Sequence, residues 1–487
     1  MTREIDIEKL ESLFDKCSDV IFQPFEYANE SSNDTVVLAY CKGISDEALI
    51  LKTVMPGLND MFRQSGFAGE LLAEHANLLL FPFTDMKSED DAIRSVLCGN
   101  LLIWFERRKR LYCVHISDTP ERKPEDSSVE PPIFGPRDAF VENLSVNVAL
   151  IRKRMRSPSL KFECFSVGTH SRTDIGLLYL EHTAAPDVIG EIRKRIEKLE
   201  IEALYSNEQL KNLVSDQSLT LFPLMGITSR PDHTLESLLR GRFALIVDGL
   251  PAAQIAPVTL SYLFNAAEDA HSPVLYVSFS RLLRKLSLFI TLFLPGLWAS
   301  LTTFHQDQIP FPLLSTIIVS TQGVPMSSSY ELLLMILMFR LFFEAGSRLP
   351  STIGPALSVV GGLIVGDATI RAGMTSPTTL IIAALTFTAG FTNQSHGLNA
   401  STAILQIVIL LLSTYLGLFG FFIGMFGIVL YWASLSSFGV PYLAPISPPN
   451  FKSLAASLIK IPWTYSQRSV KARVVTEPDR SERKEEK

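Results

Sequence analysis

Ionisable side chains stand inside long apolar segments in the second half of this chain. Only seven Asp, Glu, Lys or Arg residues occur between residues 286 and 450, although the whole chain has 44 basic and 50 acidic side chains. An ionisable group in a bilayer costs about 2.5–3.5 kcal/mol at the centre, so it usually pairs, faces water or marks an ion path. The chemistry expected of these residues is ion pairing or ion conduction. The candidates for a pore or gate are Glu331, Arg340, Glu344, Arg348, Asp367 and Arg371.

The spacing of these charges fits a helix. Arg340, Glu344 and Arg348 are four residues apart, so one continuous helix would place them in a single stripe. Asp367 and Arg371 repeat this spacing. Two interpretations stay open, a ladder of salt bridges at the membrane–water border and a stripe that lines a pore or cavity.

Small residues recur every fourth position in two of the apolar segments. In lipid, such a face lets helix backbones approach closely and drives association by packing. The predicted packing residues are Gly354, Ser358, Gly362 and Gly366, and then Gly420 and Gly424.

Charged residues also gather just before the first apolar run. Arg281, Arg284 and Lys285 form a basic collar there, which the positive-inside rule places on the cytoplasmic side. Glu268, Asp269 and His271 stand a few residues earlier. We expect these three residues, together with Arg281 and Arg284, to couple the membrane domain to the part of the chain that precedes it.

The elements that must carry these residues are membrane helices. The apolar runs at 286–304, 378–391 and 403–435 suit a hydrocarbon core about 30 Å thick. The last run would be about 50 Å long as one helix, so it is either steeply tilted or broken near Gly417 and Gly420. The basic tail predicts a cytoplasmic C-terminus and an even number of crossings. The charged N-terminus lacks an apolar run, which predicts a cytosolic head.

The fold class predicted is mixed, with a two-lobed α/β (α+β) cytosolic head followed by an α-helical multi-pass membrane domain. Strands are expected at 34–40, 101–106, 111–116, 161–167, 175–180 and 243–247, with helices at 46–54, 138–156 and 186–200. The predicted domains are a lead-in (1–30), lobe I (31–117), a proline-rich linker (118–134), lobe II (135–265), the membrane domain (266–450) and a basic, then disordered tail (451–487).

No enzyme or cofactor is indicated by the sequence. The five cysteines form no CxxC pair, and the eight histidines form no HExxH motif. The head has an ordinary balance of charges, which does not suggest nucleic-acid binding.

Several motifs in order resemble one family, the A subunits of GerA-type nutrient germinant receptors of spore-forming bacteria. The match runs from about residue 135 to 447. It is carried by the motifs at 135–142, 147–154, 230–232, 241–242, 247–251, 268–269, 309–310, 324–325, 344–350, 360–373, 436–442 and 445.

The resemblance implies a subunit of a germinant receptor in the spore inner membrane, with its N-terminal domain in the cytosol. It also implies a transporter-like B subunit and a lipoprotein C subunit as partners, besides membrane lipid. Family A subunits are thought to form a homo-oligomeric ion channel that starts germination. This chain departs from the family pattern at Ile336 and Arg340, where acidic residues are common, at Phe343, where arginine is common, and at Ala270-His271.

Two other functions remain open at this stage. One is a non-conducting signalling scaffold for the transporter-like partner. The other is a solute carrier, because broken glycine-rich helices also occur in transporters.

Overall fold

Two compact units make up the chain in this computed structural model, which describes residues 7–29, 32–65, 67, 81–82, 89–118, 135–347, 366–392 and 395–460. Unit 1 comprises Met1–Leu219, Met225–Pro257 and Val470–Lys487; unit 2 comprises Thr220–Leu224 and Val258–Ser469. The short segment 220–224 belongs to unit 2, although the chain on both sides of it belongs to unit 1.

The first sheet of unit 1 is antiparallel. Its strands, in spatial order, are β1 (Val20–Asn29), β2 (Ser32–Cys41), β4 (Leu101–Phe105), β5 (Arg110–Val114) and β3 (Phe81–Pro82). Strand β1 lies within the predicted lead-in of residues 1–30. Its proline, Pro24, hides the strand pattern in the sequence, and it is tolerated because β1 is an edge strand.

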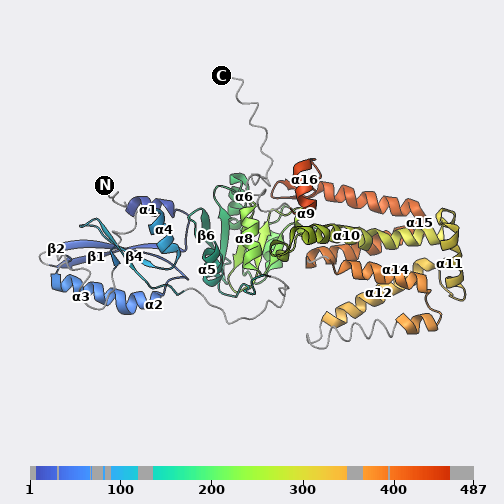
Figure 1. The fold of residues 1–487 in the computed structure, drawn as a ribbon, viewed down its shortest axis with the longest axis horizontal. Coiled ribbons are helices and arrows are strands. Elements are labelled where there is room, and N and C mark those ends of the chain that lie inside the picture. Colours follow the sequence, from blue (N-terminus) through green and yellow to red (C-terminus); the bar gives the residue numbers. More distant parts are fainter. Residues whose placement is uncertain are drawn as a thin grey trace, which may run out of the picture. The chain divides into compact units, whose positions relative to one another are not determined.

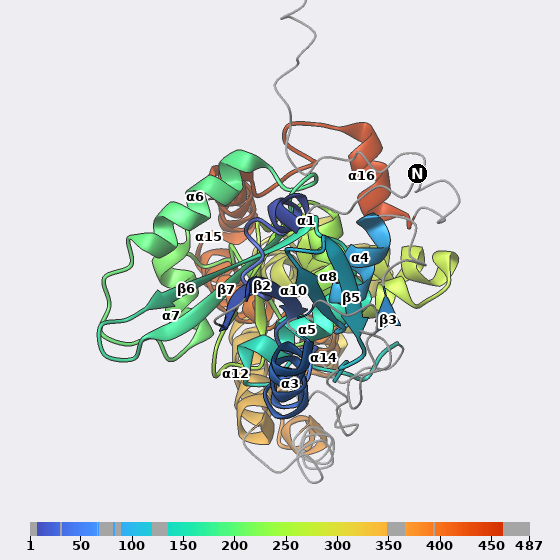
Figure 2. The same cartoon turned by 90° about the vertical axis from the view of Figure 1, so that its left-hand side faces the viewer.

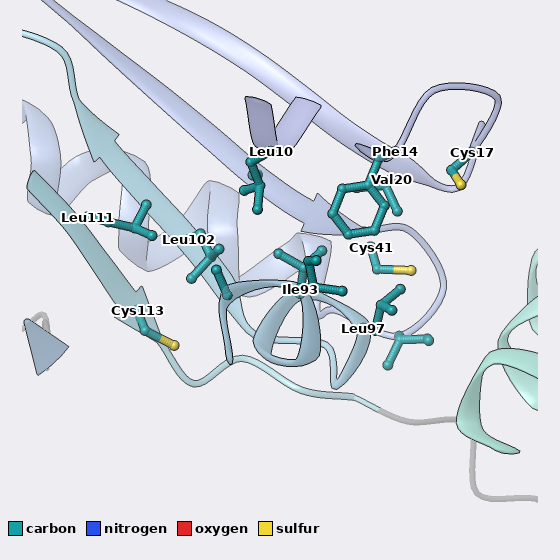
Figure 3. Packing of buried hydrophobic residues seen from close by; sticks show 14 of the residues in the cluster. Leu10, Phe14, Cys17, Val20, Cys41, Ile93, Leu97, Leu102, Leu111 and Cys113 are labelled. Carbon is teal, nitrogen blue, oxygen red and sulfur yellow. The ribbon is translucent and has the colours of Figure 1, made fainter. Parts of the chain in front are cut away.

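Helices cover both faces of this sheet. Successive side chains of a strand point to opposite faces, so one strand packs against helices on both sides. Ile103 of β4 packs in the cluster that includes Leu58 of α3 (Met55–Ser65), and its neighbour Leu102 packs in the other cluster. The second cluster contains Leu10 of α1 (Ile7–Leu13), as well as Ile93 and Leu97 of α4 (Glu89–Leu97) (Figure 3). The short α2 (Glu47–Leu49) and a π-helical turn (Ile50–Val54) lead into α3, on the face opposite α1 and α4 (Figure 1).

The second sheet of unit 1 is also antiparallel. In spatial order its strands are β6 (Leu160–Val167), β7 (Thr173–Leu180), β9 (Phe243–Val247), β10 (Ala253–Ala256) and β8 (Gly226–Thr228). Its helices are α5 (Leu144–Arg154), α6 (Pro186–Glu197), α7 (Asn207–Val214) and α8 (Pro231–Leu239). The predicted mixed fold class is thus confirmed, and the two antiparallel sheets make the head α+β.

Helices flank the second sheet on its two faces as well. On one face, the side chains of Phe162 of β6 and Leu144 of α5 both lie close to Gly176 of β7. A Cβ atom on Gly176 would come within 2.9 Å of Leu144. The next residue, Glu163, points the other way and pairs with Arg193 of α6, which lies beside β6 (Figure 2).

Helix α5 begins at Leu144, six residues later than the sequence pattern predicted. Asn143 caps the helix by accepting a hydrogen bond from the Val146 amide at 3.1 Å. The carboxylate of Asp248 accepts a hydrogen bond from the Leu144 amide at 2.9 Å. Carboxylates stabilise helix N-termini, so the start of α5 is set by a residue that is distant in the sequence.

Unit 2 is helical. Its elements are α9 (Leu260–Leu263), α10 (Val274–Thr303), α11 (Phe311–Thr321), α12 (Ser328–Ser347), α14 (Pro377–Gly390), α15 (His396–Ser434), α16 (Phe451–Leu458) and a hairpin of β11 (Ser436–Ser437) and β12 (Val440–Pro441). Helix α10 contacts α12, α14 and α15. The bundle core contains Ala299 of α10, Ile336 of α12, Ala383 of α14 and Leu410 of α15. Among the described residues, two stretches, Val274–Thr303 and Gly397–Ser434, are long and apolar enough to cross a membrane by length and composition.

Helix α15 doubles back at Gly417, which has φ 62° and ψ −142°. A Cβ on Gly424 would lie 3.1 Å from Ile409, whereas residues fifteen apart in a straight helix are separated by about 22 Å. The last apolar run is therefore two antiparallel limbs. Of the two predicted alternatives, a tilt or a break near Gly417, the break is the one observed.

Candidate functional site in the membrane unit

Glu331 lies in the first turn of α12 and is completely buried. Its Oε2 atom accepts hydrogen bonds from the Ser376 amide at 2.8 Å, the Ser376 hydroxyl at 3.0 Å and the Thr375 hydroxyl at 3.3 Å. Ser376 is the N-cap of α14, so the carboxylate stands at the positive ends of two helices. Its other oxygen, Oε1, has no hydrogen-bond partner among the described residues. Glu331 thus ties α12 to α14.

Arg340 is half-buried further along α12 and donates a hydrogen bond to Gln406 of α15 at 3.4 Å. Glu344 follows one turn later on the same helix and is exposed. The structure therefore brings Arg340 and Glu344 to one helix, as their spacing predicted. The third member of the predicted stripe, Arg348, lies outside the described residues.

Asp367 and Arg371 form an ion pair of 2.8 Å at four-residue spacing. Both side chains are largely exposed, 61% for Asp367 and 79% for Arg371. An exposed pair of this kind contributes little to stability in water, about 0–1 kcal/mol. Their pairing fits the salt-bridge interpretation of the spacing.

Three of the predicted packing residues, Gly366, Gly420 and Gly424, lie in the described part of the chain. A Cβ on Gly366 would lie 3.6 Å from Leu380 of α14. Gly420 and Gly424 face Leu412 and Ile409 of the first limb of α15, so they contact helix residues of the same chain. Outside the described residues lie the other three predicted packing residues, Gly354, Ser358 and Gly362.

Asp269 is the centre of a buried ionic network before the first long helix. Its carboxylate accepts hydrogen bonds from Arg281 Nε at 3.0 Å and from Arg284 Nη2 at 2.5 Å. Glu268 lies in the same 3-10 turn as Asp269 (Ala267–Ala270), and His271 directly follows this turn. Three of the five predicted coupling residues therefore meet in one cluster, and the other two adjoin it.

The network extends to the end of the described chain. Lys460 donates hydrogen bonds to the carbonyls of Asp269, Ala270 and Ser272. Lys285 of α10 donates to the Ser457 carbonyl of α16 at 2.9 Å. Buried charges need such partners, because removing a charge from water without compensation costs several kcal/mol. The start of α10 is thus held to α16.

Two of the positions where the chain departs from the family pattern, Ile336 and Phe343, have apolar neighbours. Ile336 is buried in the core of the bundle, next to Ala299, Ala383 and Leu410. The ring of Phe343 lies 5.3 Å from the ring of Phe391. Ile336 thus packs between helices, whereas Phe343 is 45% exposed.

Sequence reasoning missed a buried ion pair in unit 1. Arg152 of α5 contacts Asp19, and the thiol of Cys41 lies 3.7 Å from the same carboxylate. Burial alone would lower the pKa of Arg152, but the Asp19 carboxylate outweighs it and the pKa is raised. Burial raises the pKa of Cys41. Arg152 lies within the motif at 147–154, but nothing in the sequence identified its partner, which is 133 residues away.

No group of three or more His, Cys, Asp or Glu side chains that could hold a metal ion occurs in the part of the chain that the structure describes.

Comparison with known proteins gives consistent matches over almost the whole chain. A family model described as Bacillus/Clostridium GerA spore germination protein matches residues 8–472. The chain is 37% identical over 471 residues to spore germination protein XA of Bacillus anthracis, covering 96% of each. It is 32% identical over 447 residues to spore germination protein KA of Bacillus subtilis strain 168, covering 92% of this chain and 82% of that one.

Two further matches concern the membrane and the head. The uncharacterized membrane protein YfkQ of Bacillus subtilis strain 168 is 32% identical over 459 residues, covering 94% of this chain and 88% of that one. The crystal structure of the N-terminal domain of the A subunit of the Bacillus megaterium spore germinant receptor GerK3 gives a TM-score of 0.37 at 25% identity. That match covers 52% of this chain and 92% of the other.

These matches describe germination and membrane proteins, and none of them describes an enzyme. The family match spans the motifs from which the resemblance was drawn. The predicted family is therefore confirmed, and the chain is a membrane protein that belongs to the GerA family of spore germination proteins, the A subunits of germinant receptors.

Proposed function

We propose that this receptor subunit lines or gates an ion-conducting homo-oligomer that starts germination. The observation that carries the proposal is the series of ionisable side chains along one helix of the membrane unit, α12. Glu331 is completely buried, Arg340 is half-buried and Glu344 is exposed. Such groups are expensive in lipid and mark ion paths or water-filled cavities.

The exposed charges of the membrane unit favour an oligomer. Glu344 and the pair Asp367–Arg371 lie on the surface of this single chain. Contact with other subunits or with a water-filled path would keep them from lipid. Leu341 is 71% exposed on the same helix and offers apolar surface for such a contact. We place the receptor in the spore inner membrane with unit 1 in the cytosol, together with a transporter-like B subunit and a lipoprotein C subunit.

The Asp269 network is proposed to couple the receptor's head to its membrane helices. The D269N variant removes one negative charge from between Arg281 and Arg284, so we expect a slower nutrient response with the protein still in the membrane. An unchanged response would remove Asp269 from the coupling path.

The proposal is tested by ion flux through liposomes that carry this chain with its B and C partners, with and without candidate nutrients. Nutrient-dependent flux is expected, and E344K should alter it. The matched control is E197K, a charge reversal at an exposed position of α6 in unit 1. Flux that E344K and E197K leave equally unchanged would remove Glu344 from the path.

An intact complex with no flux under any condition would instead favour the non-conducting scaffold. The solute-carrier hypothesis rested on broken helices. In α15 the break at Gly417 is a reversal between two limbs, so this helix does not favour a carrier.

A further inference from the structure

Residues 220–224 form a short segment that packs into unit 2, although the chain on both sides of it belongs to unit 1. Phe222 is completely buried in this segment. Its ring lies 6.1 Å from Tyr431, 5.5 Å from Trp432 and 6.2 Å from Tyr442. By contrast Leu219, the last residue before the segment, is 96% exposed. Leu221 is still 43% exposed, so the burial of the segment begins at Phe222.

Hydrogen bonds hold this segment to both limbs of the α15 hairpin. The Ser401 hydroxyl, on the first limb, donates to the Leu221 carbonyl. The Leu221 amide donates to the Tyr431 hydroxyl, on the second limb, at 3.0 Å. Pro223 packs on the first limb at Gly397, where a Cβ would come within 3.2 Å of it. One residue, Leu221, thus bridges two limbs whose sequence positions are thirty residues apart.

The β11–β12 hairpin fixes the far end of the segment. Ser437 is buried, and its hydroxyl donates to the Leu224 carbonyl at 2.7 Å and accepts from the Val258 amide at 3.1 Å. Leu224 and Val258 are the residues at which the chain leaves and re-enters unit 2. A single hydroxyl therefore joins two separate passages of the chain. The turn of this hairpin has positive φ at Phe438 (49°) and Gly439 (77°), which suits a tight two-residue connection.

We propose that residues 220–224 are a fixed strut that transmits displacement of unit 1 to the ends of the α15 hairpin, with Phe222 and Ser437 as its positioning residues. Both ends of the segment are covalently continuous with unit 1, and its central residue, Phe222, is buried against α15 and against Tyr442, the residue after β12. A pull on the segment must therefore move these ends or expose Phe222 to water. This proposal rests on the proposed receptor function, because the response it transmits is the opening of the membrane unit.

The first test measures the docked geometry without any nutrient response. The five native cysteines, all in unit 1, are first replaced by serine. Cysteines are then placed at Leu221 and Ser401, and oxidative cross-linking is measured in native membranes. The matched control pairs Ser401→Cys with Leu219→Cys, at the exposed neighbour. We expect cross-linking of the first pair well above the control, in resting and in nutrient-treated membranes. Equal cross-linking of both pairs would overturn the docked segment.

The second test measures signalling in spores that carry this receptor alone. We expect F222A to slow nutrient-triggered ion release at least tenfold, at an unchanged level of protein in the membrane. F222L should restore much of the rate because it refills the apolar site, and L219A should be neutral. A normal rate with F222A would overturn the proposal.

Cross-linked L221C/S401C protein separates a fixed strut from a segment that must undock. The fixed strut predicts a normal response in the locked state. Loss of the response on locking, restored by a reductant, would overturn it. Should the unmodified receptor give no ion release at all, the proposed function fails, whereas the cross-linking comparison still decides whether the segment is docked.

Discussion

Arg152 of α5 holds Asp19, the residue before β1, by two hydrogen bonds of 2.6 Å and 2.9 Å. Arg152 is completely buried and Asp19 is 5% exposed. The backbone supports the same contact, because Ser18 N donates to the Phe162 carbonyl at 2.9 Å. One buried ion pair thus ties the first sheet of unit 1 to the second, and it closes a separation of 133 residues.

Removing either member of this pair should loosen unit 1. R152A leaves the Asp19 carboxylate buried without its partner, which typically costs about 3–5 kcal/mol. We expect faster hydrogen exchange of the backbone amides in β1 and α5 of the full-length protein in detergent. Mass spectrometry of peptides that cover residues 16–29 and 144–160 measures this.

The double variant D19A/R152M is the control, because replacing both charges by apolar groups is often nearly neutral. Exchange that is as fast in the double variant as in R152A would show that the pair does not hold the sheets together through its charges.

The stability of unit 1 should fall in acid through Glu163. Burial would raise the pKa of Glu163, but hydrogen bonds from Arg193 and Tyr179 outweigh it and the pKa is lowered from its ordinary value of 4.5. A carboxyl with a lowered folded-state pKa stabilises the fold above its unfolded-state pKa, and this stabilisation is lost as the pH falls below 4.5.

Unfolding of the full-length protein between about pH 6 and about pH 3 measures this loss. In E163Q the free energy of unfolding should depend less on pH in acid, and it should be lower at neutral pH. The control is E197Q, at an exposed position of the same helix that carries Arg193. If the stability of E163Q fell with pH as steeply as that of the unmodified protein, other carboxyls would be responsible for the loss in acid.

Glu331 should act first as a hydrogen-bond acceptor between α12 and α14. E331A removes the acceptor of the Ser376 amide and the Thr375 hydroxyl, and each unmet buried group costs about 1–3 kcal/mol. The Ser376 hydroxyl keeps a second acceptor, Thr379 Oγ1 at 2.8 Å. E331Q can offer its amide oxygen to the same donors. We expect a clear drop in the melting temperature of the detergent-solubilised protein for E331A and a small one for E331Q. A drop of equal size in both variants would mean that the negative charge itself is required.

The α15 hairpin should depend on Gly424 but not on Gly427. A valine at 424 would collide with Ile409, because even a Cβ would lie 3.1 Å from it, and overpacking of this kind typically costs about 1–3 kcal/mol. At Gly427 nothing lies within 4 Å of the Cβ position. G424V should therefore melt at a lower temperature than G427V, in detergent at equal expression. Equal melting temperatures would argue against the close approach of the two limbs.

Local patterns in the sequence were sufficient for much of the architecture. Hydrophobic periodicity predicted β2, β4, β5, β6, β7, β9 and α6, because alternation and helical spacing are properties of neighbouring residues. Low charge and long apolar runs predicted a helical membrane unit, and the motif series predicted the family. The spacing of Asp367 and Arg371 left a salt bridge and a pore-lining stripe open, and the structure shows the two side chains as an ion pair.

Contacts between distant residues were decided only by the tertiary structure. Nothing in the sequence shows that Asp19 meets Arg152, that Asp248 sets the start of α5, or that Glu331 reaches Ser376. The choice between a tilt and a break in α15 also needed the fold, because glycine permits the reversal at Gly417 but does not require it. The segment 220–224 lacks a periodic pattern, and its burial arises entirely from packing against α15 and the β11–β12 hairpin. The sequence by itself determined the family, the apolar helical half and the elements with a clear local periodicity. The pairing of elements, and with it the buried ionic contacts, followed from burial energies that depend on partners far along the chain.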